Sequence, residues 1–222
     1  MTNSARDGAT VTTHEQDAAA WLESLLAVVA AAPDFTAAAD TLLARFCERL
    51  GADRGYVMLL DAESRQLNPV ISRGYEDREP PTARILDDVN DPFVVCTLGV
   101  RVVSCTHGPP RSGVSRKMRM LVIPFSQPRT PEVPAFLAST DASRLLVAPC
   151  TIEPWDDAEV FSEGPARSAF SPYGVIVVET DSRVEGVDIT ARAARLAGPI
   201  LARVGAADAH RRRAEELADQ RS

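Results

Sequence analysis

The stretch YGVIVVET, at residues 173–180, decides the fold because it leaves no polar face for water. Side chains alternate between the two faces of a β-strand. Val175 and Val177 therefore share one face of this strand, and Ile176 and Val178 share the other. A strand that is apolar on both faces belongs inside a sheet that is covered on both sides. The rest of the chain must therefore provide two covers.

Helices are predicted at both ends of the chain. Thr13 and Gln16 match a capping box ahead of an apolar helical pattern, so residues 1–12 are expected to form a flexible tail. Asp34 is the expected N-cap of a second helix, which Gly51 follows where a terminating glycine belongs. Residues 187–220 again repeat apolar side chains at helical spacing, which predicts a long final helix.

Four short apolar runs between these helices are predicted strands. Residues 54–61 and 67–74 are expected to pair as a hairpin, in which Pro69 indicates an edge or a bulge. Residues 143–150 and 173–180 follow after an irregular region that is rich in Pro and Arg. This order predicts an α+β fold, in which the terminal helices cover one face of an antiparallel sheet. The irregular region would cover the other face, and it either encloses a small-molecule cavity or packs solidly.

Two segments resemble a known family. FTAAADTLLARFCERLGADRGYVMLLD, which runs into the hairpin, is similar to the opening of a GAF domain. LLVAPC, paired with YGVIVVETD and followed by a long helix, is similar to its close. The resemblance covers nearly the whole chain, with residues 13–206 as the GAF-like domain and 207–222 as a C-terminal helical extension. It implies a sensory or regulatory module that binds a small ligand or a partner, and PAS domains share the architecture.

Composition and charge narrow the possible partners of the protein and its expected location in the cell. The chain has 222 residues and a net charge of -7, which disfavours nucleic-acid and anionic-membrane partners. The sequence contains neither a membrane-spanning apolar run nor an N-terminal signal pattern, so a cytoplasmic location is expected. The four cysteines are then expected to be reduced thiols. Lys117 is the only lysine among many arginines, a bias typical of GC-rich bacterial genomes.

The ligand-binding motifs of known GAF domains do not identify a ligand for this chain. The Asn-Lys pattern of cyclic-nucleotide-binding members is absent, and no cysteine is followed by the histidine that bilin-binding members use. Cys96, Cys105 and His107 lie close together in the sequence and match the donor types of zinc or iron, but buried packing explains them better. No metal site is therefore predicted, and the sequence identifies no cofactor.

The prediction is a non-catalytic sensor that signals through its terminal helices. The expected ligand-binding residues are Cys96, Cys105, His107, Met118, Phe125 and Cys150. A homodimer is also expected, together with an output protein supplied in trans. Its interface residues would be Trp21, Leu25, Ala207, Ala214 and Leu217. The alternative is a thiol-dependent enzyme of the free methionine sulfoxide reductase type, which would use Cys96, Cys105 and Cys150.

Overall fold

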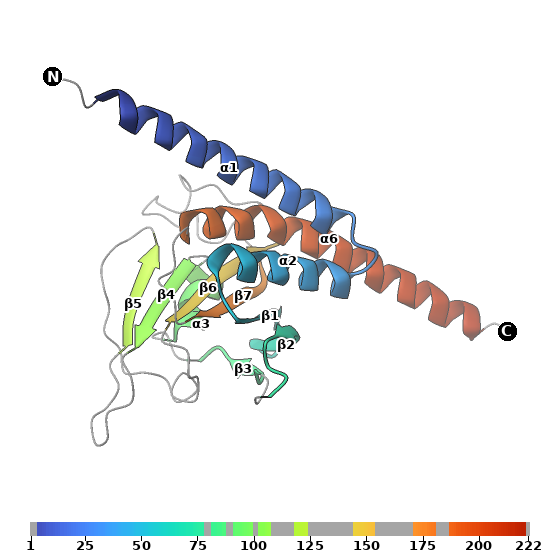
Figure 1. Cartoon of the computed structure of the whole chain (residues 1–222). Helices are drawn as coiled ribbons and strands as arrows, with labels where there is room; N and C mark the ends of the chain where they lie inside the picture. Colours follow the sequence, from blue (N-terminus) through green and yellow to red (C-terminus); the bar gives the residue numbers. More distant parts are fainter. Residues whose placement is uncertain are drawn as a thin grey trace, which may run out of the picture.

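The structure is a computed structural model, and it describes residues 4–77, 81–87, 91–99, 102–107, 118–123, 144–153, 171–180 and 187–220 (Figure 1). Its elements, in chain order, are α1 (Ser4–Ala30), α2 (Phe35–Leu50), β1 (Arg54–Asp61), β2 (Gln66–Arg73), β3 (Arg84–Ile85), α3 (Pro92–Gly99), β4 (Val102–His107), β5 (Met118–Ile123), β6 (Arg144–Thr151), β7 (Pro172–Thr180) and α6 (Val187–Asp219). No helix in these ranges is both long and apolar enough to cross a membrane.

The described strands form one antiparallel sheet in the order β3-β2-β1-β7-β6-β4-β5. The strand that the sequence places inside the sheet, β7, pairs with β1 on one side and with β6 on the other. Val177 lies opposite Tyr56 of β1 and Val147 of β6. The predicted α+β fold and the interior position of β7 are confirmed.

Each face of the sheet has its own apolar core. The helix-side core joins α1, α2 and α6 to alternate residues of the central strands, among them Ile176 and Val178 of β7. The cover-side core joins α3 and β4 to the opposite residues, among them Val175 and Val177. All four of these β7 side chains are at most 1% exposed. The central strand is therefore shared between the two cores.

Helix α2 begins and ends as the sequence predicts. Asp34 adopts an extended backbone, and its Oδ1 accepts a hydrogen bond from the Ala37 N–H at 2.8 Å. Gly51 ends the helix with a φ of 58°, in the left-handed region that glycine tolerates best. Helix α1 differs from the prediction, because it begins at Ser4 rather than at the Thr13 capping box. Residues 4–12 therefore continue the helix instead of forming a flexible tail.

The hairpin of β1 and β2 carries the irregularity that Pro69 predicts. Met58 pairs with Pro69 while Val57 pairs with Ile71, so the register shifts and Val70 has no opposite residue. Strand β3 pairs with β2 only at Gln66 and Leu67, which lie before the proline. Proline lacks an N–H and cannot donate a hydrogen bond to a neighbouring strand. A strand therefore tolerates proline at a bulge, or where the neighbouring edge strand pairs over only a few residues.

Helix α6 contacts the sheet through a glycine. A Cβ atom built on Gly198 would lie 2.8 Å from the backbone N and 2.9 Å from the backbone O of Thr151 in β6. The helix and strand backbones are therefore too close for any side chain at this position. This contact places the middle of α6 directly against β6.

The substitution Gly198→Ala tests this close packing. Alanine normally stabilises a helix interior by about 1 kcal/mol relative to glycine. Here we expect the opposite sign, a loss of about 1 to 3 kcal/mol in the free energy of unfolding, because α6 must move away from β6. Urea unfolding measures the change. The exposed control Ala206→Gly should show only the ordinary glycine effect, and a stabilised Gly198→Ala variant would contradict the contact.

Candidate functional site

The cover face of the sheet is the candidate site, and its best-defined lid is helix α3. Asp91 precedes this helix, and its Oδ1 accepts a hydrogen bond from the Phe93 N–H at 2.7 Å. The other carboxylate oxygen lies 3.0 Å from a guanidinium nitrogen of Arg84 in β3. The same guanidinium stacks over the Phe93 ring at 5.1 Å from its centroid. Pro92 suits the first helical position, which needs no N–H partner. One charged pair thus fixes the start of α3 over the sheet.

A second group of polar side chains is buried beside the first strand. Nε of Arg54, at the start of β1, lies 3.6 Å from a carboxylate oxygen of Glu179 at the end of β7. The hydroxyl of Tyr75 donates a hydrogen bond to the other Glu179 oxygen at 2.7 Å. Arg54 and Glu179 are only 9% and 4% exposed. Because a buried charge is costly unless it is paired, these three side chains depend on one another.

Two tyrosines extend this group toward α3. The rings of Tyr56 and Tyr75 meet edge to face with their centroids 6.0 Å apart. Burial raises the pKa of both phenols far above the usual value, and the charge of Glu179 raises each pKa further. Both hydroxyls are therefore protonated at physiological pH, and that of Tyr75 donates its hydrogen bond to Glu179. The charge of Arg84 lowers the pKa of Tyr56 and that of Asp91 raises it, both by less than burial and Glu179 do.

Helix α3 also buries a hydroxyl that has no partner. Thr97 is fully buried, and within the described chain its Oγ1 makes no hydrogen bond. A threonine inside a helix commonly bonds the carbonyl one turn earlier, which this one does not do. A buried polar group without a partner costs about 1 to 3 kcal/mol. The cover face therefore retains an unused hydrogen-bonding group next to its apolar core.

Comparison with solved structures identifies this architecture. The chain is similar to a free methionine-R-sulfoxide reductase from Neisseria meningitidis, solved in complex with its substrate, with 15% identity, a TM-score of 0.55 and coverage of 87% of this chain and 93% of that one. It is also similar to the phycoerythrobilin-bound GAF domain of a cyanobacterial phytochrome, with 14% identity, a TM-score of 0.53 and coverage of 83% and 95%. A third match is the GAF domain of a phosphoenolpyruvate-protein phosphotransferase from Coxiella burnetii, with 13% identity, a TM-score of 0.53 and coverage of 91% and 98%.

The chain has the GAF domain fold. At these identities the likeness shows the fold alone. Neither the protein-family models nor the curated protein sequences gave a match to this chain.

The GAF fold separates the cysteines that the sequence groups together. Cys96 of α3 and Cys105 of β4 lie in the cover-side core, as the predicted ligand site requires. Cys150 of β6 lies instead in the helix-side core, beneath α6. Side chains alternate along β6, so Leu145 and Val147 face the cover while Leu146 and Ala148 face the helices. Cys150 therefore does not line the cover face, which corrects its predicted place among the ligand-binding residues.

Burial determines the protonation state of these thiols. It raises the pKa of Cys150 to about 12 and raises the pKa values of Cys96 and Cys105 well above the ordinary thiol value. The charges of Cys150 and Cys105 add to the shift at Cys96, and that of Asp91 adds to the shift at Cys105. A thiol that stays protonated is a poor nucleophile and a poor metal ligand. The three cysteines therefore act as small apolar side chains in this structure.

The other predicted ligand-binding residues are placed only in part. His107 ends β4 and Met118 begins β5, where the two residues pair across the strands. The structure does not describe their side chains, and Phe125 lies outside the described residues altogether. Within the part that is described, no three metal-binding side chains come together.

The predicted dimer residues divide between the core and the surface. Leu25 is 1% exposed and belongs to the helix-side core, so it is not available to a second copy. Trp21 is half-buried, with its ring 6.3 Å from that of Phe46. Ala207, Ala214 and Leu217 are exposed along the end of α6, where Leu217 is 55% exposed.

Sequence reasoning missed the polar residues of the cover face. Glu179 carried the one available signal, because it follows Val175 and Val177 on the same face of a doubly buried strand. A carboxylate at that position must find a buried partner. Its partners Arg54 and Tyr75 gave no signal of their own, since they are far from Glu179 in the sequence. The second pair, Arg84 and Asp91, gave none either.

Replacing the buried hydroxyl tests whether α3 packs as described. Thr97→Val keeps the shape of the side chain and removes its unpartnered oxygen. We expect the free energy of unfolding to rise by about 1 kcal/mol in urea denaturation of the ligand-free protein. Thr36→Val, an exposed substitution on α2, should change it by no more than about 0.5 kcal/mol. A Thr97→Val variant that is less stable than the wild type would show that Oγ1 has a partner.

The cysteine pKa values predict a loss of stability at alkaline pH. An unfolded thiol titrates near 9.0, whereas the folded pKa of Cys150 is about 12. The folded state therefore holds more protons above pH 9, and stability falls as the pH rises, by about 1.4 kcal/mol per pH unit for each such group. Urea unfolding at pH values from about 8 to about 10.5 measures this slope. The slope should be smaller in Cys150→Ala, and an unchanged slope would contradict the raised pKa.

Proposed function

We propose that this GAF domain is a non-catalytic sensory or regulatory module that binds a small ligand on its cover face. The observation that carries the proposal is the set of polar side chains on this face, namely two groups of paired charges, two tyrosines and the unpartnered Thr97 hydroxyl of α3. A face that served only to hold the fold together would gain more from apolar side chains. Two structures of the same fold hold small molecules, namely phycoerythrobilin and the substrate of the reductase.

The arrangement also supports a route from the cover face to the terminal helices. Helix α3 packs on β6 and β7, and α6 packs on the same two strands from the opposite side. At Gly198 the backbone of α6 lies directly against the backbone of β6. A shift of β6 therefore moves the helix. A ligand that orders α3 would thus bias the position of α6, within the limit set by its differential affinity for the two arrangements.

The end of α6 is anchored well enough to carry such a change. Asp208 is 7% exposed and accepts hydrogen bonds from Arg211 at 2.5 Å and from Arg212 at 3.0 Å. Arg211 also donates to the carbonyl oxygen of Pro33, between α1 and α2, at 3.3 Å. The contact with Pro33 ties the helical extension to the domain as far as Arg211. We propose that residues beyond this point meet the output protein.

The thiol-enzyme alternative is disfavoured by the same geometry. A reductase that uses Cys96, Cys105 and Cys150 needs thiolates that meet the substrate on one face. Cys150 lies on the opposite face, and burial holds all three as thiols.

Native mass spectrometry and the absorption spectrum of the purified protein test ligand binding. We expect a mass above that of the chain, with the extra component released on denaturation. Arg54→Met and Tyr75→Phe should reduce its occupancy by about ten-fold, since each removes one polar partner from the cover face. Arg45→Met, on the exposed surface of α2, is the matched control. Equal occupancy in all four proteins would place the component elsewhere.

Hydrogen exchange on the loaded and stripped protein tests the signalling route. Protection of α3 together with the middle of α6 is expected, because β6 and β7 connect them. Protection that stops at α3 would contradict signalling through α6. Turnover of free methionine sulfoxide that Cys96→Ser abolishes, in a variant that still folds, would contradict the non-catalytic assignment.

A further inference from the structure

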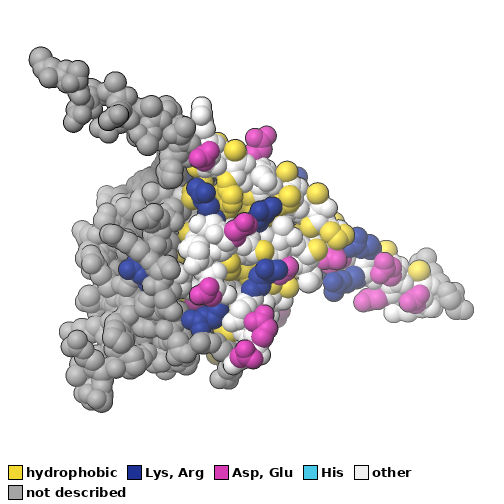
Figure 2. All heavy atoms as spheres, in the orientation of Figure 1, with side chains coloured by type: hydrophobic (Ala, Val, Ile, Leu, Met, Phe, Trp, Pro, Cys, Tyr) yellow, Lys and Arg dark blue, Asp and Glu magenta, His cyan; other side chains and the backbone are white. Residues whose placement is uncertain are grey.

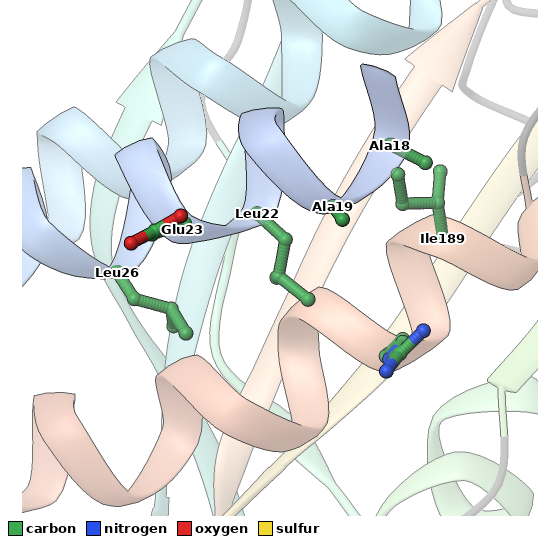
Figure 3. Close-up of a pocket in the computed structure, with 7 residues that line it drawn as sticks. Ala18, Ala19, Leu22, Glu23, Leu26 and Ile189 are labelled. Atoms are coloured by element: carbon green, nitrogen blue, oxygen red, sulfur yellow. The ribbon is translucent and has the colours of Figure 1, made fainter. Parts of the chain in front are cut away.

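Helices α1 and α6 run side by side in the same direction and enclose a groove (Figure 1). The groove has a volume of about 480 Å³, and its lining is mostly apolar, with Leu22 and Leu26 from α1 and Ile189 from α6. Figure 3 shows Leu22 and Leu26 pointing from α1 toward α6. The charged side chains of Glu23 on α1 and Arg192 on α6 also line the groove, and both are exposed. The groove is therefore open to solvent.

Helix α6 carries an excess of positive charge beside this groove. Residues 189–214 contain six arginines and one acidic residue, Asp208. Asp208 is buried and already pairs with Arg211 and Arg212. Arg192 and Arg203 are exposed, and within the described chain neither makes an ion pair. The exposed charge of this stretch is therefore positive, although the whole chain has a net charge of -7.

The two unpaired arginines lie on one side of α6. Positions 192 and 203 differ by eleven residues, which is about three helical turns and a rise of roughly 16 Å. Because Arg192 lines the groove, the basic stripe that it begins runs along the edge of the groove. This length exceeds that of a small molecule and suits an extended partner such as a helix.

The opposite edge of the groove is only weakly charged. Residues 16–32 of α1 include Asp17 and Glu23 and no basic residue, and most of the other exposed positions are alanine. Figure 2 shows apolar side chains exposed among the charged ones along the two helices. Short side chains allow another helix to approach closely, and an exposed apolar groove with a polar rim is typical of a protein interface.

The stripe and the groove together favour an acidic protein partner. A second copy of the chain would bring the two acidic residues of α1 against six arginines, which leaves most of the positive charge unbalanced. A nucleic acid would neutralise the arginines, but its phosphates would be repelled by Glu23 and its surface would leave the apolar groove uncovered.

We propose that the groove is the docking site for an acidic amphipathic helix of another protein. Its apolar side chains lie between α1 and α6, and its carboxylates lie against Arg192 and Arg203. A helix that lays its apolar face into a groove between two others is a common mode of peptide recognition. The proposal goes beyond the proposed function, because it requires neither a ligand on the cover face nor the output protein that meets the end of α6.

Two synthetic peptides test the sign of the surface on the full chain. Both place leucines at alternating spacings of three and four residues, and the flanking positions are glutamate in one and lysine in the other. Fluorescence anisotropy of the labelled peptides measures their dissociation constants. The glutamate peptide should bind at least about ten-fold more tightly, and its affinity should fall as salt is added. The net charge of -7 by itself favours the lysine peptide, so equal or tighter binding of that peptide would overturn the proposal.

Charge reversal locates the binding surface. Arg192→Glu and Arg203→Glu should each weaken binding of the glutamate peptide by about ten-fold, since each replaces an attraction with a repulsion. Arg45→Glu makes the same change in net charge on the exposed surface of α2 and should weaken it much less. Because all three side chains are on helix surfaces, circular dichroism should match the wild type. If the effect of Arg192→Glu is no larger than that of Arg45→Glu, the peptide binds elsewhere and the proposal is wrong.

Filling the groove provides an independent variant. Ala19→Trp puts a large side chain into the groove, whereas Ala20→Trp adds the same side chain to the exposed surface of α1 outside it. Only the first should exclude the glutamate peptide, and an Ala19→Trp variant that binds it as the wild type does would contradict docking in the groove.

Two further measurements distinguish the other occupants. Tighter binding of a single-stranded DNA oligonucleotide of the same charge as the glutamate peptide would overturn the proposal in favour of nucleic acid. A dimer in sedimentation that Ala19→Trp alone dissociates would overturn it in favour of a second copy. The peptide measurements apply equally to protein with and without a molecule on the cover face, so they succeed or fail separately from the proposed function.

Discussion

The structure depends on the double burial of β7. Val175, Ile176, Val177 and Val178 are all at most 1% exposed, which requires a complete cover on each face of the sheet. Hydrogen bonding on both edges is then provided by β1 and β6, because a buried backbone group without a partner is costly. Gly174 belongs to the same constraint, since a Cβ there would collide with the Met58 carbonyl oxygen of β1. The sheet therefore closes tightly around one strand.

The two covers differ in character. The helix side is an apolar core built from three helices, with Phe46 and a series of leucines and alanines. The cover side mixes an apolar centre with charges at its margin, where Arg54, Glu179 and Tyr75 form one group and Arg84 and Asp91 form another. Such groups fix orientation through hydrogen bonds and respond to a polar molecule in a way that methyl groups do not. This difference is why the cover side is proposed as the ligand-binding face.

The elements that sequence patterns predict well are those whose signals are local. The caps of α2 at Asp34 and Gly51, the hairpin with its irregularity at Pro69 and the buried strand β7 all follow from neighbouring residues. The predicted start of α1 is too late. A capping box marks a place where a helix can start, but it does not prevent the helix from starting earlier in the chain. Strands β3, β4 and β5 and helix α3 have only short apolar pieces of the irregular region as signals, and their packing depends on distant partners.

The sequence by itself determined the α+β class, the interior strand and the helices at both ends, because each follows from the spacing of apolar residues along a short segment. Only the tertiary structure decided which cysteines share a face, which charges are paired and where α1 meets α6. Cys150 and Cys105 both occupy apolar strands, yet alternation along β6 and β4 sends them to opposite cores. Arg54 and Glu179 meet because β1 and β7 are adjacent in the sheet. Contacts of this kind depend on strand order and register, which no local pattern in the chain encodes.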